Sequence, residues 1–570
     1  MTSPIRIANC SGFYGDRLAA AQEMVEGGPI DVLTGDWLAE LTMLILFKDT
    51  LKNPGGGYAK TFLRQMEQVM GTCLDRGIKV VANAGGLNPA GLAEALRTLA
   101  DTLGLQPSIG HVEGDNLTGR LPASVTNVDT GEELGDRTVL TANAYLGAWG
   151  IVDALGRGAD IVVTGRTTDA AIVMGPAAWH HGWGRDDYDA LAGALVAGHV
   201  IECGCQATGG NYAFFQEVPG LEHPGFPIAE VAADGSSVIT KHEGHGGLVS
   251  VGTVTAQLLY EITGPRYLNP DVTARFDTIA LSQQGPDRVL ISGVRGEEPP
   301  DTSKACLNLA GGVKASLTFP LTGLDIEAKA DLLVRSLLAG QDHASVEVDL
   351  VRTDQQDPMR NEVATAQLRL TLKDPDDSRL GRVLTARVVE LGLSTYPGFY
   401  GGPSSSGAYG VYWPSLVPNS LLTHEVWVDG SRLDVAPTPG TGVSVPVPEP
   451  AVPGFVVEAT HRMPLGRIAG ARSGDKGGNA NLGVWVRTEA EFVWLAHLLT
   501  TSELKVLLPE TAALRVERFV FPNLRALNFV IHGLLGEGVA SSSRQDAQAK
   551  SLGEYLRAKH VDVPLSLLAS

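Results

Sequence analysis

The sequence predicts an α/β protein, with an N-terminal parallel-sheet α/β domain, an α+β extension of it and a small C-terminal ferredoxin-like α+β domain. Three observations lead to this prediction. Short β-branched segments alternate with helical patterns over the first 200 residues, and each segment ends at a polar cluster containing Gly. A proline-rich stretch then precedes a separate segment, residues 454–570. Such alternation is typical of parallel βαβ units.

Five apolar segments are expected to form the parallel strands. The carboxyl ends of parallel strands share one edge of a sheet, where α/β proteins bind their ligands. Asp36, Asn83, Glu113 and Arg166 each follow one segment, so they should surround one cleft. The expected strands are residues 5–9, 30–33, 78–81, 109–112 and 161–163, and the helical patterns include residues 17–26, 58–76 and 89–103.

Arg166 is expected to hold an anion in this cleft. Because an arginine at a strand end is seldom part of a core, Arg166→Ala should weaken anion binding and change stability by only ~1 kcal/mol.

At 570 residues the chain is too long for one core, so two or three domains are expected. Residues 1–450 are assigned to an α/β core domain: a parallel βαβ part to residue 200, an α+β part at 201–435 and a Pro-rich linker at 436–453. Pro-rich segments are extended and semi-rigid. Truncation at Pro453 is therefore expected to leave a soluble N-terminal domain that has lost activity or assembly.

Charge and composition exclude several classes of partner. The net charge of −20 disfavours binding to nucleic acid or to anionic membranes. No apolar run reaches the ~18 residues of a membrane helix. Five cysteines without a disulfide framework and an N-terminus without a signal peptide indicate a cytoplasmic protein. The edges of an antiparallel C-terminal sheet predict a homo-oligomer.

A first candidate cluster contains Glu202, Cys203 and Cys205 in a Gly-rich loop that continues to Asn211. A C-x-C pair can bind a metal or supply a nucleophile, but no second pair completes a zinc site. Buried, inert thiols are the alternative. This loop is expected to approach the same cleft as Asp36.

The second cluster contains His242 and His245 in a loop with two glycines. These imidazoles could bind a metal or act as acid and base, and the sequence leaves open whether a metal is bound. The loop precedes an expected helix, so its amides could also hold an anion. Two loop histidines without a task are the alternative.

The third cluster is the most polar loop of the chain, residues 472–481, between two expected strands. Its cations, amides and glycines suit a bound phosphate or carboxylate. It is not a Walker loop, and a plain hairpin loop is the alternative. The chain also lacks G-x-S-x-G and G-x-G-x-x-G, so neither an α/β-hydrolase nor a dinucleotide oxidoreductase is indicated, and no cofactor is evident.

Several motifs in this chain resemble the acyclic terpene utilisation protein A (AtuA) family. They lie at residues 7–17, 34–40, 82–86, 141–147, 163–169 and 202–211. The resemblance spans nearly the whole chain and implies a ferredoxin-like C-terminal domain with residues 472–481 as its signature loop. Founding members are associated with bacterial catabolism of citronellol and geraniol, which passes through branched, carboxylated acyl-CoA thioesters. The resemblance thus implies an anionic substrate, with acyl-CoA as a candidate, and partners from the acyl-CoA carboxylase pathway.

The first functional hypothesis is a cytoplasmic hydratase or lyase acting on a carboxylated, branched acyl-CoA or a related acid. Such chemistry needs a base and an array that holds developing negative charge. The alternatives are a thioesterase, amidase or acyl transferase with a cysteine nucleophile, and a non-catalytic assembly subunit. Candidate catalytic residues are Asp36, Glu202, Cys203, Cys205, His242 and His245. Candidate substrate-binding residues are Ser11, Gly12, Asn83, Gly85, Gly86, Asn143, Thr164, Arg166, Asp169, Asn211, Arg472, Ser473, Asp475, Lys476 and Asn479.

Overall fold

The structure is a computed structural model that describes residues 3–122, 124–442, 446–456 and 458–568. It divides into two compact units. The first comprises Met1–Asn308, Trp413–Gly536 and Gln548–Ser570, and the second comprises Leu309–Tyr412 and Glu537–Ala547. Residues 201–435, which are expected to form one α+β part, are instead divided between the two units. Strand β14 (Thr302–Thr322) runs through the boundary without a break, so no turn signal marks it.

A mixed sheet of eleven strands forms the centre of the first unit, in the order β11-β12-β8-β7-β1-β2-β3-β6-β4-β18-β19. The five strands in its middle run parallel and correspond to the five apolar segments. The predicted α/β class is confirmed, although antiparallel strands flank the parallel ones on both sides. The strands are β1 (Ile5–Asn9), β2 (Val32–Gly35), β3 (Lys79–Ala82), β6 (Ile161–Thr164), β4 (Ile109–Glu113), β7 (Pro227–Val231), β8 (Ser237–Lys241), β12 (Arg288–Ser292), β11 (Ala280–Gly285), β18 (His424–Val428) and β19 (Ser431–Val435).

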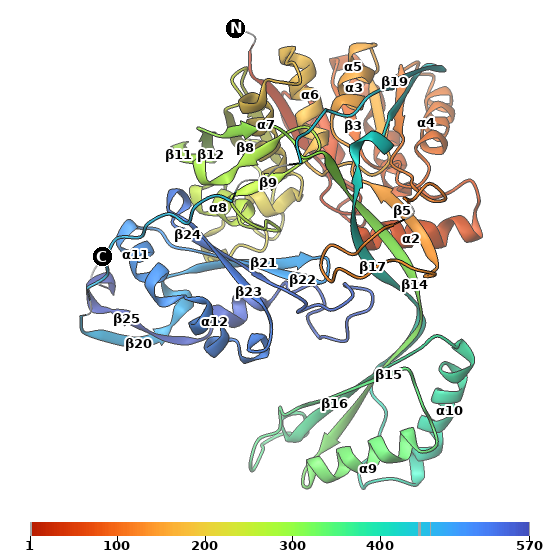
Figure 1. Ribbon diagram of the computed structural model, residues 1–570, viewed down its shortest axis with the longest axis vertical. Coiled ribbons are helices and arrows are strands. Elements are labelled where there is room, and N and C mark those ends of the chain that lie inside the picture. The colour runs from red at the N-terminus through yellow and green to blue at the C-terminus, as the bar shows by residue number, and fades with distance from the viewer. Residues whose placement is uncertain (1–2, 123, 443–445, 457, 569–570) are drawn as a thin grey trace. The chain divides into compact units, whose positions relative to one another are not determined.

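Helices cover both faces of this sheet (Figure 1). The chain moves one way along the sheet from β1 to β4, and back through β6 to β7. Because βαβ crossovers are right-handed, the two directions place their helices on opposite faces. Helices α1, α3 and α4 pack together on one face, and α5, α6 and α7 on the other. The bounds are α1 (Ala20–Glu26), α2 (Glu40–Lys52), α3 (Lys60–Arg76), α4 (Pro89–Leu103), α5 (Trp149–Gly156), α6 (Ala171–His181), α7 (Tyr188–Ile201) and α8 (Val251–Leu258).

The topological switch point of the sheet lies between β3 and β6. These strands are neighbours, yet α4 follows β3 on one face and α6 follows β6 on the other. In open α/β sheets the crevice outside such strand ends is where ligands bind. The two loops meet closely here, because a Cβ on Gly85 would lie 2.5 Å from the carbonyl oxygen of Thr164.

The C-terminal part of the chain folds around a four-stranded antiparallel sheet in the order β21-β22-β24-β23. The prediction of a long polar loop at residues 472–481 is wrong. Strand β21 continues to Lys476, and the turn is confined to Gly477 and Gly478, the first of which has φ 66°. Its elements are β20 (Thr460–Pro464), β21 (Gly470–Lys476), β22 (Asn479–Trp485), α11 (Glu489–Leu498), α12 (Thr501–Leu507), β23 (Val516–Phe521), β24 (Ala526–Ile531), α13 (Leu552–Arg557) and β25 (His560–Pro564).

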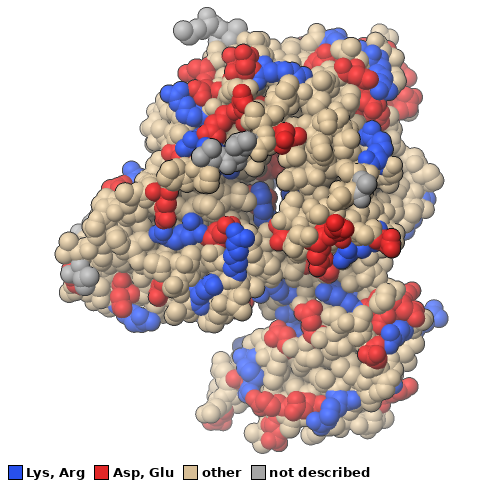
Figure 2. Space-filling view, in the orientation of Figure 1, with Lys and Arg blue, Asp and Glu red and all other residues tan. Residues whose placement is uncertain are grey.

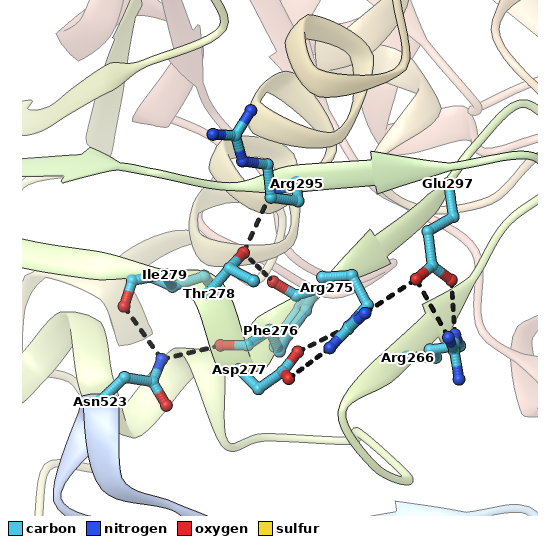
Figure 3. Close-up of polar contacts among 9 residues, drawn as sticks. All are labelled: Arg266, Arg275, Phe276, Asp277, Thr278, Ile279, Arg295, Glu297 and Asn523. Atoms are coloured by element: carbon cyan, nitrogen blue, oxygen red, sulfur yellow. Dashed lines mark hydrogen bonds and ion pairs between the residues drawn. The ribbon is translucent and has the colours of Figure 1, made fainter. Parts of the chain in front are cut away.

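This C-terminal sheet packs directly on the N-terminal part of the same unit. Asn523 donates hydrogen bonds from Nδ2 to the carbonyl oxygens of Phe276 and Ile279, both at 2.9 Å (Figure 3). The segment that accepts these bonds, residues 276–279, follows a strand of a small three-stranded sheet. Beside it, the guanidinium of Arg275 donates to both Asp277 and Glu297. The strands of this sheet are β9 (Arg266–Leu268), β10 (Thr273–Arg275) and β13 (Arg295–Glu297).

The second unit has its own core between a four-stranded sheet and two helices (Figure 1). The sheet order is β15-β16-β14-β17, and β5 pairs with β14 outside this path. The remaining bounds are β5 (Val139–Ala144), β15 (Ser345–Val351), β16 (Thr365–Asp374), β17 (Ser404–Pro418), α9 (Ile326–Leu338) and α10 (Arg382–Glu390).

Positive and negative side chains are mixed over the face drawn in Figure 2, where no stripe of one sign forms. Within the described ranges, no helix has the length and apolarity needed to cross a bilayer.

The homo-oligomer stays a prediction, which light scattering at micromolar concentration can check.

His424 on β18 gives a pH-dependent stability that can be measured. Its Nδ1 accepts a hydrogen bond from the amide of Gly150 at 3.2 Å, and burial with nearby Arg185 lowers its pKa to about 4. An unfolded histidine has a pKa of about 6.5, so the unfolded state takes up the proton first and stability is lost as pH falls from about 6.5 to 4. His424→Asn keeps an acceptor and does not titrate. Between pH 7 and 4 the free energy of unfolding should shift by about 3 kcal/mol in favour of the variant. Equal pH dependence of the two proteins in urea unfolding would contradict this.

Candidate functional site

Asp36 and Asn83 meet at the carboxyl ends of β2 and β3. Asn83 donates from Nδ2 to Asp36 Oδ1 at 2.6 Å, and its Oδ1 accepts from the amide of Trp37 at 2.8 Å. The amide of Asp36 donates to the carbonyl oxygen of Ser11 at 2.8 Å, which ties the loop to the end of β1. Burial raises the pKa of Asp36 to about 8, and nearby Asp169 adds to the rise.

Arg166 joins the loop after β6 to this pair. Its guanidinium donates to the carbonyl oxygen of Leu38 and lies 3.2 Å from Asp169 Oδ1, over the ring of Tyr145. The expectation that Arg166 lies outside the core is wrong, because it is only 3% exposed. The guanidinium is enclosed by the carboxylates that it neutralises.

Asp115 fixes the backbone of the same loop. Its Oδ2 accepts from the amide of Arg166 at 2.9 Å and from Asn143 Nδ2 at 2.7 Å. Burial raises the pKa of Asp115 to about 6, although these two donors oppose the rise. Asn143 therefore serves as a support for Asp115.

Glu202 reaches the cluster from the end of α7. Asn9 donates from Nδ2 to the carbonyl oxygen of Glu202 at 3.2 Å. Gly12 lets the two chains approach, since a Cβ there would lie 2.6 Å from the carbonyl carbon of Cys203. One oxygen each of Asp36, Asp169 and Glu202 then lies within 4.8 Å of the other two. Burial raises the pKa of Glu202 well above its usual value, and Asp169 and Asp36 add to the rise.

Glu40 and Lys304 form an ion pair beside Arg166 and Tyr145, and neither residue is among the candidates predicted from the sequence. Glu40 Oε1 accepts from the Tyr145 hydroxyl at 2.7 Å and pairs with Lys304 Nζ at 3.2 Å. Burial favours the neutral form of Glu40, but Lys304 and Arg166 hold its pKa well below the ordinary value. Glu40 stands four residues after Asp36, whereas nothing in the sequence marks Lys304 on β14.

The C-terminal domain adds charged groups from β21. Lys476 Nζ donates to the carbonyl oxygen of Glu261 at 2.5 Å, and burial with nearby Lys304 lowers its pKa. Asp475 pairs with Lys550 at 3.2 Å. Burial and Glu261 raise the pKa of Asp475 to about 6. Glu261 has a left-handed backbone (φ 57°), which local sequence does not reveal.

Arg472, also on β21, reaches the N-terminal loop after the two cysteines. Its guanidinium donates to Gln206 Oε1 and lies over the ring of Tyr260. Ser473 Oγ accepts from the amide of Gly553 in its own domain. Asn479 Oδ1 accepts from the amide of Gly533, and its Nδ2 donates to Asp129 Oδ1 of the N-terminal part at 2.9 Å.

The histidine loop does not join the cluster. His242 donates from Nε2 to the carbonyl oxygen of Met24 at 2.9 Å, and its ring packs on Gly27 beside α1. The ring of His245 lies 5.5 Å from it, centroid to centroid. Burial lowers the pKa of His242. The role of these histidines as acid and base in the cleft is therefore not supported by their position.

Four more predicted residues have other surroundings. Glu113 lies opposite Glu425 in the β4–β18 pair, where burial and this neighbour raise its pKa. The amide of Gly86 donates to the carbonyl oxygen of Asn83, so Gly86 serves the turn rather than an anion. Thr164 donates from Oγ1 to the carbonyl oxygen of Gly165. Asn211 is exposed, with a left-handed backbone.

Neither cysteine has the surroundings of a nucleophile. Cys203 donates from Sγ to Glu202 at 3.3 Å, and burial with that carboxylate raises its thiol pKa well above the ordinary value. Cys205 donates to the carbonyl oxygen of Pro224, and burial raises its pKa to about 12. A reactive thiolate needs a cation or imidazole that outweighs its burial. Arg17 only partly opposes the rise at Cys205, and Cys203 bonds a carboxylate.

Gly12 offers a direct test of how the cluster is assembled. Alanine at this position would collide with the backbone of Cys203 and push Glu202 away from Asp36. We expect Gly12→Ala to lower the free energy of unfolding by about 1–3 kcal/mol in urea. The matched control is Gly71→Ala in α3, where the nearest atom is 3.8 Å away, and it should stabilise by up to about 1 kcal/mol. Equal effects of the two changes would contradict the close approach.

The fold and this site define a doubly wound α/β protein with a cluster of acidic side chains near its switch point, beside which a small antiparallel α+β domain packs. The chain belongs to the acyclic terpene utilisation family AtuA, which it matches over residues 5–428, and residues 463–562 match the AtuA ferredoxin-like domain. The predicted resemblance and the ferredoxin-like C-terminal fold are thus confirmed. The family is implicated in acyclic terpene utilisation, which is consistent with a catabolic role. No curated protein and no solved structure matches the chain.

Proposed function

We propose that this protein is a hydratase or carbon–carbon lyase acting on a carboxylated, branched acyl-CoA or a related acid. One observation carries the proposal: buried and half-buried carboxylates and lysines from two domains converge near the switch point of the sheet. Asp36, Asp169 and Glu202 come from the N-terminal part, as does Lys304, and Lys476 comes from the C-terminal domain. A scaffold without a ligand would not need buried charges at this position.

The chemistry of the site suits addition of water or cleavage next to a carbonyl group. Such reactions need proton-exchanging groups beside cations that hold the negative charge developing on the substrate. The cluster offers carboxyl groups and the Tyr145 hydroxyl for the first task, and Lys304 and Lys476 for the second. The membership in a terpene utilisation family supports a branched acid as the substrate class.

The thiol-dependent alternative is less well supported. Cys203 and Cys205 donate hydrogen bonds as thiols, and their surroundings disfavour the thiolate. A non-catalytic assembly subunit remains the other alternative, with partners in an acyl-CoA carboxylase pathway.

Turnover assays on the full-length protein test the proposal. Branched, carboxylated enoyl- and 3-hydroxyacyl-CoA thioesters would be followed by mass spectrometry for a gain of water or a cleaved product. Lys476→Met and Glu202→Gln should each lower kcat/KM by about 10²-fold or more. Glu113→Gln is the matched control, because Glu113 lies opposite Glu425 on β18, and it should leave kcat/KM unchanged.

Two results would count against the proposal. One is the absence of both turnover and thermal stabilisation with every thioester and acid in the panel, which would favour the assembly subunit. The other is activity lost on alkylation of Cys203 or Cys205 and protected by substrate, which would favour a thiol enzyme.

A further inference from the structure

Three carboxylates at the strand ends have the spacing of a cation site. One oxygen each of Asp36, Asp169 and Glu202 lies within 4.8 Å of the others, and Asp36 is only 3% exposed. Hard divalent ions bind carboxylate oxygens at 2.0–2.6 Å, so ligands on opposite sides of the ion are about 4–5 Å apart. The spacing of the three oxygens therefore suits one ion.

Glu202 provides independent evidence for a ligand. It is 7% exposed and its carboxylate faces Asp36 and Asp169. Among the described residues, the one hydrogen bond to this carboxylate comes from the weakly donating thiol of Cys203, at 3.3 Å. Buried carboxylates are normally paired with a cation or with several N–H donors. Glu202 thus lacks the partner that its burial requires.

The cations around the cluster are already engaged by other groups. Arg166 forms an ion pair with Asp169, whose Oδ1 lies 3.2 Å from the guanidinium. Lys304 pairs with Glu40, and Lys476 donates to a carbonyl oxygen. When all three are ionised, the carboxylates carry three negative charges, and the one positive charge of Arg166 leaves a net charge of about −2, which one divalent ion would balance.

This excess of negative charge also conflicts with an anionic substrate, which it would repel. A bound cation removes the conflict, because it neutralises the carboxylates and attracts a carboxylate or thioester oxygen.

We infer that Asp36, Asp169 and Glu202 bind one hard divalent cation of the Mg²⁺ or Mn²⁺ type, and that this cation holds an oxygen of the substrate. The inference rests on the proposed function only for the identity of that substrate. All-oxygen donor sets favour these ions over softer metals. The metal would act as a Lewis acid on the oxygen it holds.

Metal binding can be measured without any activity assay. Full-length protein stripped with a chelator would be titrated with Mn²⁺, whose free form is read by electron paramagnetic resonance, and Mg²⁺ would be used as competitor. We expect one Mn²⁺ per chain. Glu202→Gln keeps the shape of the side chain and removes its charge, so it should weaken binding by roughly tenfold or more. Glu113→Gln should bind as the wild type does.

The inference is overturned if the folded wild-type protein binds neither Mn²⁺ nor Mg²⁺, which would mean that protons neutralise the cluster. It is also overturned if Glu202→Gln binds with unchanged affinity. If Glu202→Gln does not fold, Asp169→Asn replaces it in the Mn²⁺ titration, and unchanged affinity would again overturn the inference. The side chain of Asp169 is 30% exposed and tolerates change better. Metal binding without turnover would refute the proposed function alone, whereas turnover by the chelated protein would refute the metal alone.

Discussion

Replacing Arg166 with methionine should lower the free energy of unfolding by about 3–5 kcal/mol. The side chain is 3% exposed, pairs with Asp169 and also lies close enough to Glu40 and Asp36 to act on their pKa values. Methionine fills a similar volume but leaves these carboxylates in a buried site without their cation. Breaking a buried ion pair by removing one partner is costly for this reason, far beyond the ~1 kcal/mol expected from a position at a strand end.

Urea unfolding at neutral pH measures this loss. The matched control is Arg120→Met, since Arg120 is exposed and donates only to backbone carbonyl oxygens. That change should stay within about 0.5 kcal/mol. If the two variants lose the same small amount of stability, the guanidinium of Arg166 is not the counter-charge that the geometry indicates.

The parallel centre of the sheet could be predicted because its signals are local. Each strand is a short β-branched run, and each stops at a glycine-containing turn, so both the strands and the shared edge follow from the sequence. That argument also brings Asp36, Asn83, Arg166 and Asp169 together, as the structure does. Glu113 ends the neighbouring strand and acts on the pKa of Asp115, but its strongest charged neighbour is Glu425 on β18.

The other half of the site depends on contacts between distant segments. Lys304 lies on a long strand, and Glu261 follows α8 in a backbone conformation that no local motif marks. Lys550, which lies just before α13, pairs with Asp475 on β21. Their positions follow from tertiary packing, which a single sequence does not encode as a pattern.

The polar clusters at His242 and Gly85 show the opposite error. Both have compositions typical of a ligand site, yet the structure explains them by packing. His242 bonds the end of α1, and Gly85 lets the loops after β3 and β6 touch. Glycine and histidine satisfy close backbone approach and buried hydrogen bonds as readily as they serve ligands, so composition alone does not distinguish the two.

Removing residues 454–570 should leave a chain that is poorly soluble and does not unfold cooperatively, in contrast to the soluble domain expected from the linker. The C-terminal sheet covers Leu259 and Tyr260 so closely that a Cβ on Gly483 or Gly474 would lie within 2.5 Å of them. Each large side chain that returns to water costs about 1.5–3 kcal/mol. The deletion also takes Lys476 away from the carbonyl oxygen of Glu261, and Lys550 away from the carboxylate of the same residue.

The second unit would be damaged by the same deletion, because residues 537–547 belong to it. Lys314 donates to the carbonyl oxygens of Ala540 and Ser542, and Lys373 donates to Ser541. Soluble yield and a thermal melt of the truncated chain measure the combined effect.

Cutting the linker without removing the domain is the matched control. A protease site placed at residues 449–451, which lie in irregular structure, should give two fragments that still elute together. Their docking contacts, such as the two bonds from Asn523, remain intact (Figure 3). Asn523→Ala in the cut protein should then weaken the association, since two buried carbonyl oxygens lose their donor at about 1–3 kcal/mol. A truncated chain that melts cooperatively within a few degrees of the full-length protein would show that the two parts fold independently after all.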